Sequence, residues 1–290
     1  MKNGKAGERI FDLGVYSVLI LLMAVSVYPL LHVLFASLSD GGEIVRHRGI
    51  LFRPLGFNLD AYKIVLSNAS VMSGYLNTLY IVVIGLFVNL VMTTLGAFVL
   101  SRRNVLWNNT FMFVIVFTMF FSGGIIPLYL TVKGVGLIDS LASVVVPFAI
   151  STFNLIILRT SFMALPVTLE ESAKMDGAGH LTVLLRIVLP LSLPALAVIE
   201  LYYAVGNWNG WFWASVFIKD SSKFPLQLVL RQILIQNSTD SMLSSTDNAF
   251  QVGESIKYAT IMVATLPILC VYPFIQRFFV KGVLIGALKG

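Results

Sequence analysis

Residues 170–180, EESAKMDGAGH, bring three carboxylates, a lysine, two glycines and a histidine together in an otherwise mostly apolar chain. Carboxylates can form charge-assisted hydrogen bonds to a basic partner, and glycines permit a sharp bend or a close approach of backbones. Such a stretch could dock another protein. The alternative is an ordinary loop, in which the acids cap a helix and the glycines end one.

A second polar group follows in residues 196–213, LAVIELYYAVGNWNGWFW. At 100° per residue, four of its side chains share an arc of about 80° on one helix face. They are Glu200, Tyr203, Asn207 and Trp211. An ionised carboxylate facing lipid would cost roughly 2.5 to 3.5 kcal/mol, so we expect this face to point to the protein interior or to water. The alternative is that Glu200 is protonated or paired with a neighbouring helix, and that the aromatic side chains are interfacial anchors.

Catalytic patterns are missing from the sequence. His32, His47 and His180 lie in separate segments without metal-ligand spacing, and Cys270 is the only cysteine. The chain has no HExxH, no GxSxG and no GxxxxGK[ST] phosphate loop, so we expect neither a metal site nor ATP binding by this chain. A membrane-embedded enzyme would need paired acid–base or metal residues, whereas Glu200 is the only carboxylate well inside an apolar run.

The composition predicts a polytopic membrane protein. Of 290 residues, 57% are apolar and 12% are charged, and the mean hydropathy is +0.87. Six apolar runs are each long enough for a transmembrane helix, which needs about 17 to 25 residues. They are 11–38, 75–100, 110–130, 141–163, 191–217 and 259–280. The expected fold is therefore all-α with six transmembrane helices in one domain, 1–290. The first run is too long for the apolar core of a cleaved signal peptide, so we expect a signal anchor.

Basic residues set the expected orientation. With both termini in the cytoplasm, Arg102, Gly177 and Lys289 lie inside, and Lys63 and Lys223 lie outside. Basic residues are scattered over both sides, so no nucleic-acid partner is expected. The first long outer segment, residues 39–70, is expected to be a loop with short helical turns, and the polar residues 236–255 are expected to be mobile.

The segment 165–190 has the pattern of two short helices joined by a glycine bend. Thr168 and Glu171 have the spacing of a capping box. The acids Glu170 and Glu171 also suit the first turn of a helix, where the helix dipole places partial positive charge. Gly177 can adopt the left-handed conformation that ends a helix. A second helix is predicted from the apolar spacing of residues 181–188, with Pro190 ending the pattern.

The segment 165–190, called the coupling loop below, resembles the EAA loop of binding-protein-dependent ABC importers. The matching positions are Glu171, Ser172, Ala173, Asp176, Gly177, Ala178, Ile187, Leu189 and Pro190, with Ser172 where the family most often has alanine. FSGGIIPLYLTVKGVGLIDS, VGNWNGWFWASVFI and YPFIQRFFVKGVLIGALKG also resemble sugar-importer permeases, in the branch that handles complex oligosaccharides.

This resemblance implies a permease subunit, not an enzyme, in a prokaryotic inner membrane. The implied partners are a homologous second permease, two cytoplasmic ATPase subunits that hold ATP and magnesium, an extracellular solute-binding protein and the lipid bilayer. Glu170, Glu171, Ser172, Ala173, Asp176, Gly177 and Ala178 would couple to the ATPase. The polar stripe from Glu200 to Trp211 would line the solute path, its rings stacking on sugars, with Trp208 and Asn209 near the outer mouth but pointing away from the arc. A secondary carrier is the rival class, but no internal symmetry supports it.

Overall fold

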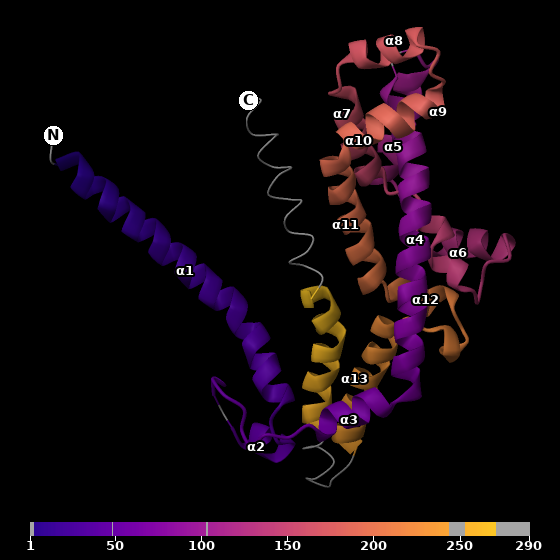
Figure 1. Cartoon of the computed structure of the whole chain (residues 1–290). Helices are drawn as coiled ribbons and strands as arrows, with labels where there is room; N and C mark the ends of the chain where they lie inside the picture. Colours follow the sequence, from indigo (N-terminus) through magenta and orange to yellow (C-terminus); the bar gives the residue numbers. More distant parts are fainter. Residues whose placement is uncertain (1–2, 48, 103, 244–252, 271–290) are drawn as a thin grey trace. The chain divides into compact units, whose positions relative to one another are not determined.

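The computed structural model describes residues 3–47, 49–102, 104–243 and 253–270 (Figure 1). The regular secondary structure of these residues is helical, and their one β-type contact is an isolated antiparallel bridge between Ser39 and Phe57. The all-α, polytopic membrane fold expected from the apolar runs is confirmed.

Two helices are long and apolar enough to cross a membrane alone. They are residues 11–37 of α1 (Asn3–Ser37) and the whole of α4 (Ala69–Ser101). Three helix pairs meet the same test only together, each with a bend. The bends are 117° between α5 (Asn108–Phe120) and α6 (Ile125–Gly134), 46° between residues 141–148 and α7 (Thr152–Met163), and 85° between residues 180–191 and α11 (Leu193–Asn209).

Four of these segments coincide with the first four expected runs, but the sequence did not indicate their bends. The fifth segment, 180–209, overlaps the expected run 191–217 only in part, because its first eleven residues were assigned to the loop 165–190. The sixth run, 259–280, is helical up to residue 270 and then continues outside the described residues. The described part of the chain thus holds up to five spans, and the count of six stays a prediction.

The described residues group into two compact units. One draws on Met1–Ala69 and Leu230–Leu266, and the other is built mainly from Ser70–Val229. The expectation of a single domain over residues 1–290 stays a prediction. Because the predicted polar stripe and the coupling loop both belong to the second unit, its internal packing positions the candidate sites below.

In the first unit, hydroxyl groups hold the loop after α1. The Ser39 hydroxyl accepts a hydrogen bond from the Leu55 N–H over 2.9 Å, and the Ser37 and Tyr62 hydroxyls lie 2.7 Å apart. Two short helices, α2 (Gly41–Arg46) and α3 (Asp60–Ser67), confirm the expected helical turns. In the second outer segment, α13 (Leu226–Leu243) continues as helix into the region expected to be mobile, and residues 244–252 lie outside the described residues.

The second unit packs around an apolar core shared by α4, α7, the coupling loop and α11. Its buried side chains include Phe98, Leu158, Phe162, Val188 and Ile199. Its remaining short elements are the 3₁₀ helices η1 (Leu141–Val144), η2 (Val146–Phe148) and η4 (Ser221–Lys223), with α8 (Val167–Met175), α9 (His180–Val183), the π-helix η3 (Leu184–Val188), α10 (Leu189–Leu191) and α12 (Phe212–Phe217).

Small and polar residues line the buried face of α4, at Gly74, Thr78, Gly85, Asn89 and Thr93. Such residues let membrane helices approach closely and hydrogen-bond across the contact. Thr78 Oγ1, for example, accepts a 2.8 Å hydrogen bond from the backbone N–H of the first residue of α13. α4 therefore packs against its neighbours partly through polar contacts.

Candidate functional site

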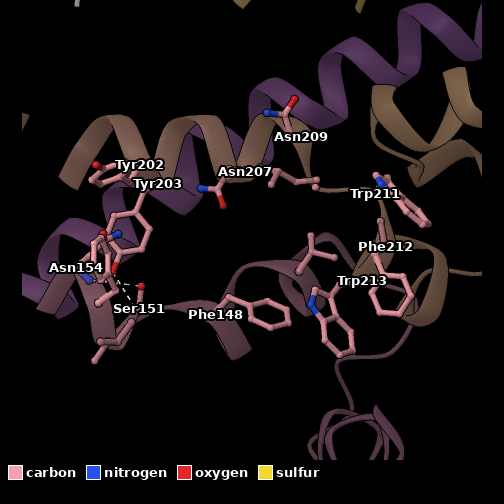
Figure 2. A pocket seen from close by; sticks show the side chains of 17 residues that line it. Phe148, Ser151, Asn154, Tyr202, Tyr203, Asn207, Asn209, Trp211, Phe212 and Trp213 are labelled. Carbon is pink, nitrogen blue, oxygen red and sulfur yellow. Dashed lines mark hydrogen bonds between the residues drawn. The ribbon is translucent and has the colours of Figure 1, made fainter. Parts of the chain in front are cut away.

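A cavity of about 650 Å³ opens where α11 ends and α12 begins (Figure 2). This volume lies within the range of roughly 300 to 1,000 Å³ typical of small-molecule sites. Seventeen residues line it, and most of its polar groups are neutral amides and hydroxyls. These come from Ser151, Asn154, Tyr202, Tyr203, Asn207 and Asn209.

The break between α11 and α12 creates the aromatic wall of this cavity. α11 ends at Asn209, Gly210 leaves the helical conformation (φ −70°, ψ 102°), and Trp211 caps the start of α12. The Trp211 and Phe212 rings meet edge to face at 5.6 Å, and the next ring, Trp213, lies 5.1 Å from Phe212. Three consecutive aromatic side chains therefore lie at one end of the cavity, where sugar rings could stack.

The ring of Phe148 lies next to the ring of Trp213, with the two ring centroids 5.3 Å apart. Its position follows from a backbone contact: the Asn89 amide donates to the carbonyls of Phe148 (2.9 Å) and Ala149 (3.0 Å). Asn89 also accepts a 3.3 Å hydrogen bond from the Asn207 amide. The polar residues of α4 thus hold two walls of the cavity in place.

Tyr203 lines the cavity, and its hydroxyl group has two protein partners. It accepts a 2.8 Å hydrogen bond from the Ser151 N–H (Figure 2). It also lies 2.7 Å from Thr93 Oγ1. The side chain is buried. Tyr203 therefore ties α4, α11 and the start of α7 together, and it presents its ring to the cavity while its hydroxyl is already occupied.

The structure separates the four residues of the predicted polar stripe. Tyr203, Asn207 and Trp211 line the cavity, but Glu200 is exposed and lies outside the lining. Placing Trp211 on the same helix was wrong, because Gly210 ends α11 first. Asn209 also lines the cavity, whereas Trp208 stands 6.4 Å from the Tyr75 ring, between centroids.

Sequence reasoning missed seven cavity residues that carry aromatic or polar groups: Phe148, Ser151, Phe153, Asn154, Tyr202, Phe212 and Trp213. The signal for two of them was present. A glycine followed by three aromatic residues cannot keep all three on one helical face, so a break at Gly210 was the simplest way to gather them. Phe148, Ser151 and Asn154 come from another helix pair, and nothing in their local sequence links them to α11.

The glycine bend of the coupling loop is confirmed. α8 ends at Met175, and Gly177 has φ +82°. The Ala178 N–H donates to the Ala173 carbonyl (2.9 Å) and the Gly177 N–H to the Lys174 carbonyl (3.0 Å). This pair of bonds is a Schellman motif, which satisfies the last carbonyls of a helix.

The capping box predicted at Thr168 and Glu171 is wrong. α8 begins at Val167, after Pro166 and two residues before the start that a cap at Thr168 would give, and no side chain caps it. Proline can occupy this position since it has no N–H to donate and its φ is already fixed. Thr168 and Glu171 therefore both lie inside the helix and are free for other roles.

The second helix of the loop differs from its prediction in two ways. Its middle is the π-helix η3, and the helical segment continues through Pro190 to Leu191 before the 85° bend. Leu184 and Val188 are buried as the apolar pattern indicated, whereas Leu181 and Leu185 are exposed.

The two faces of α8 differ in chemistry. Glu170 points inward and forms an ion pair with Arg102, which follows the last residue of α4. Burial lowers the pKa of Arg102, although a guanidinium remains protonated. On the outward face, Glu171 and Ser172 are exposed, and Met175 is 89% exposed. Of the other predicted coupling residues, Asp176 is exposed, and Ala173 and Ala178 are half-buried against the core.

A polar cluster around Asp139, called the Asp139 cluster below, joins the loop before η1 to the loop after α12. Asp139 Oδ1 accepts hydrogen bonds from the N–H groups of Lys219 (3.0 Å) and Asp220 (2.9 Å). Lys223 Nζ donates to the Asp139 carbonyl (2.9 Å). The N–H groups of Asp220 and Lys219, in that order, lower the pKa of the Asp139 carboxyl. Asp139 therefore fastens two loops beside the aromatic wall.

The described residues contain no group of three or more potential metal ligands among His, Cys, Asp and Glu. The two candidate functional sites among the described residues are the cavity at the α11–α12 break and the exposed face of α8.

Residues 81–285 match the family described as binding-protein-dependent transport system inner membrane component. The chain is 44% identical over 292 residues to the polygalacturonan/rhamnogalacturonan transport system permease protein YtcP of Bacillus subtilis (strain 168), with both chains fully covered. It is 43% identical to the protein LplC of the same organism, over all of this chain and 98% of that one. A solved bacterial ABC transporter chain involved in import of the acidic polysaccharide alginate has a TM-score of 0.84 and 31% identity, covering 94% of this chain and 98% of that chain.

Proposed function

Because the chain belongs to the family of binding-protein-dependent transport system inner membrane components, we propose that it conducts oligosaccharides through the cavity at the α11–α12 break. The chain is a permease subunit of an ABC importer for sugars and is not itself an enzyme. The family that the coupling loop resembled is thereby confirmed. The observation that carries the cavity proposal is the joining of an aromatic wall to neutral amides in one space of suitable volume.

The lining of the cavity favours recognition of sugar rings and hydroxyl groups. Its aromatic side chains offer faces on which pyranose rings stack, and Asn207 and Asn209 offer donors and acceptors for hydroxyls. None of the described lining residues is charged. YtcP is named for polygalacturonan and rhamnogalacturonan, and the alginate importer for an acidic polysaccharide. We infer that this chain binds the rings of such solutes and leaves the neutralisation of any carboxylates to other subunits.

The exposed face of α8 supports docking to a cytoplasmic ATPase. Glu171 offers a carboxylate to a basic group, and Met175 offers a flexible apolar side chain that could fill a pocket. In this proposal two ATPase subunits hold ATP and magnesium, a homologous second permease completes the path, and an extracellular solute-binding protein delivers the solute. Differential contact of this face with two ATPase states would let ATP shift the permease between inward-facing and outward-facing conformations.

The proposed orientation places both chain termini and the coupling loop in the cytoplasm, and the Asp139 cluster outside. Single cysteines at positions 177 and 223, introduced into a Cys270→Ala background, test it. We expect an impermeant thiol reagent to label position 223 on intact cells and position 177 only after lysis. The reverse pattern would overturn the orientation.

Uptake by the full complex in proteoliposomes tests the proposed function. We expect ATP-dependent accumulation of oligogalacturonides or of neutral oligosaccharides of equal length, only with the solute-binding protein present. Trp213→Ala should weaken uptake of both, since it removes an aromatic face on which sugar rings could stack. Contacts between aromatic rings are worth about 0.5 to 1.5 kcal/mol beyond their burial. Val205→Leu, a change on α11 outside the cavity lining, is the matched control. Wild-type uptake by Trp213→Ala would overturn the assignment of the cavity.

A further inference from the structure

The coupling loop carries a buried carboxylate that docking does not use. Glu170 is the only buried residue of α8, and it is 8% exposed. A carboxylate is rarely buried unless a positive charge and hydrogen bonds compensate for its lost hydration. Arg102 supplies that charge: the side chains of Arg102 and Glu170 are 18% and 11% exposed, and they form a direct ion pair. The inward face of α8 is thus attached to the end of α4 by charge.

Arg102 is held from several sides. Its guanidinium lies 4.2 Å from the centroid of the Phe98 ring, one turn back on α4. The Asn108 amide donates to the Arg102 carbonyl (3.0 Å), and Arg159 Nε donates to the Leu100 carbonyl (2.8 Å). Side chains from α5 and α7 therefore fix the backbone that carries Arg102. Glu170 meets a preorganised partner, and the pair fixes α8 to the C-terminal end of α4.

Apolar contacts also hold this part of the coupling loop against the core. Ala173 lies one turn after Glu170 on the same face, and Ala173 and Leu165 pack against the buried core. Apolar contacts are non-directional, so they hold α8 against the core without specifying its rotation. A charge-assisted pair is directional. Nε and Nη2 of Arg102 are buried without a hydrogen-bond partner among the described residues, so the guanidinium retains donors that can follow the carboxylate as α8 turns.

α4 continues without a break from this pair to the solute cavity. Asn89 and Thr93 lie on the same 33-residue helix that ends beside Arg102. Asn89 is bonded to Asn207, and Thr93 to Tyr203, at the cavity wall. At 1.5 Å per residue, about 20 Å of helix separates Arg102 from Asn89. Figure 1 shows α8 near one end of α4 and α12 farther along it.

We propose that the Arg102–Glu170 ion pair is the joint through which a displacement of α8 by the ATPase reaches α4 and the cavity walls. This inference rests on the proposed function. Glu170 and Arg102 are positioning residues, since their side chains are largely buried, whereas Glu171 and Met175 are exposed on the docking surface. Without the pair, α8 should still dock and ATP should still be hydrolysed, but the motion of α8 should no longer be passed to α4.

The test uses the complete importer in proteoliposomes, with solute moved per ATP hydrolysed as the readout. For Glu170→Gln and for Arg102→Lys, which keeps the charge but loses the planar fork, we expect the ATPase subunits to co-purify normally. Solute moved per ATP should fall about 5- to 150-fold, the usual span of a coupling free energy. Asp60→Asn, which breaks the exposed 2.8 Å pair with Lys63, is the control and should leave the ratio unchanged.

The double variant Arg102→Met/Glu170→Met separates positioning from stability. Replacing both members of a buried ion pair by apolar residues is often neutral for stability, whereas removing one leaves a charge unpaired. We therefore expect the double variant to unfold at the wild-type temperature and to remain uncoupled. Recovery of solute moved per ATP together with stability would overturn the proposal, as would wild-type coupling in Glu170→Gln. Absence of ATPase from the wild-type complex would instead overturn the proposed function on which it rests.

Discussion

Gly85 on α4 lies so close to Asn207 on α11 that a Cβ added at Gly85 would come within 2.6 Å of Asn207 Nδ2. Gly85→Ala should therefore push the Asn207 amide away from Asn89, its 3.3 Å partner, and change the cavity wall. Overpacking of this kind costs about 1 to 3 kcal/mol. We expect a higher KM for solute uptake and a lower thermal unfolding midpoint, with the complex still assembled.

Gly14→Ala is the matched control for that substitution. Gly14 lies within α1, and no heavy atom within 4 Å would meet an added Cβ. Alanine inside a helix is favoured over glycine by about 0.5 to 1 kcal/mol, so uptake should be unchanged and stability equal or slightly higher. An unchanged KM in Gly85→Ala would show that Asn207 has room to move without affecting the solute.

Gly177 should be sensitive to the conformation that a side chain permits, and not to its volume. Its φ is +82°, and no heavy atom lies within 4 Å of an added Cβ. Leucine at this position would pay roughly 1 to 2 kcal/mol for the left-handed backbone, whereas asparagine tolerates it better. We expect solute uptake and co-purification of the ATPase to fall in the order glycine, asparagine, leucine.

Gly179→Ala provides the comparison for Gly177 because Gly179 has φ −72° and also has open space around an added Cβ. It should behave as wild type. If Gly177→Leu transported normally in this assay, the bend would have no part in coupling, and the docking face would have to keep its position without it.

Hydropathy alone located five of the spans, because the cost of exposing polar backbone in lipid forces every membrane run to be helical. Hydropathy did not reveal where these spans bend or break, because it depends on composition alone. A span interrupted by one residue, such as Gly210, keeps the composition of a continuous helix, so the predicted arc carried Trp211 past the end of α11. Contacts with residues far away in the sequence, such as Phe148 of η2 beside Trp213, place the aromatic side chains that follow.

The coupling loop was predictable where the signal is local and unpredictable where it is not. A glycine after a short helix indicates a left-handed end, and Gly177 adopts it. Two adjacent acids give no indication of which one turns inward. Glu170 is buried and Glu171 exposed because Arg102, far away in the sequence, lies under the first of them. Long-range pairs of this kind require the fold.

Glu200 should matter for assembly rather than for solute binding. It is exposed on α11 and outside the cavity lining, and an ionised carboxylate facing lipid would cost roughly 2.5 to 3.5 kcal/mol. We expect Glu200→Leu to reduce the amount of second permease that co-purifies with this chain, while complexes that do form keep the wild-type KM. Complete assembly with a changed solute preference would instead return Glu200 to the solute path.

The Asp139 cluster should depend on pH in the acid range. The pKa of the Asp139 carboxyl is lower in the folded chain than in the unfolded chain. The carboxylate therefore stabilises the folded chain above the unfolded pKa, and this stability is lost as pH falls through the folded pKa. Below the unfolded pKa of about 4 the unfolded chain takes up a proton before the folded chain does, so the folded state loses this contribution to its stability as the pH falls further. We expect the thermal unfolding midpoint to fall more steeply between pH 6 and pH 3 in wild type than in Asp139→Asn.

Asp139→Asn is the informative variant because Asp139 has φ +61°, a conformation that asparagine also tolerates. It removes the charge opposite Lys223 and keeps a side-chain oxygen for the two N–H donors. At pH 7 it should therefore be moderately less stable than wild type and should bind solute more weakly, since the loop it fastens directly follows the helix of Phe212 and Trp213. Asp139→Ala adds backbone strain and should be the least stable. Equal unfolding midpoints for wild type and Asp139→Asn across the whole pH range would show that the carboxylate charge does not hold these loops.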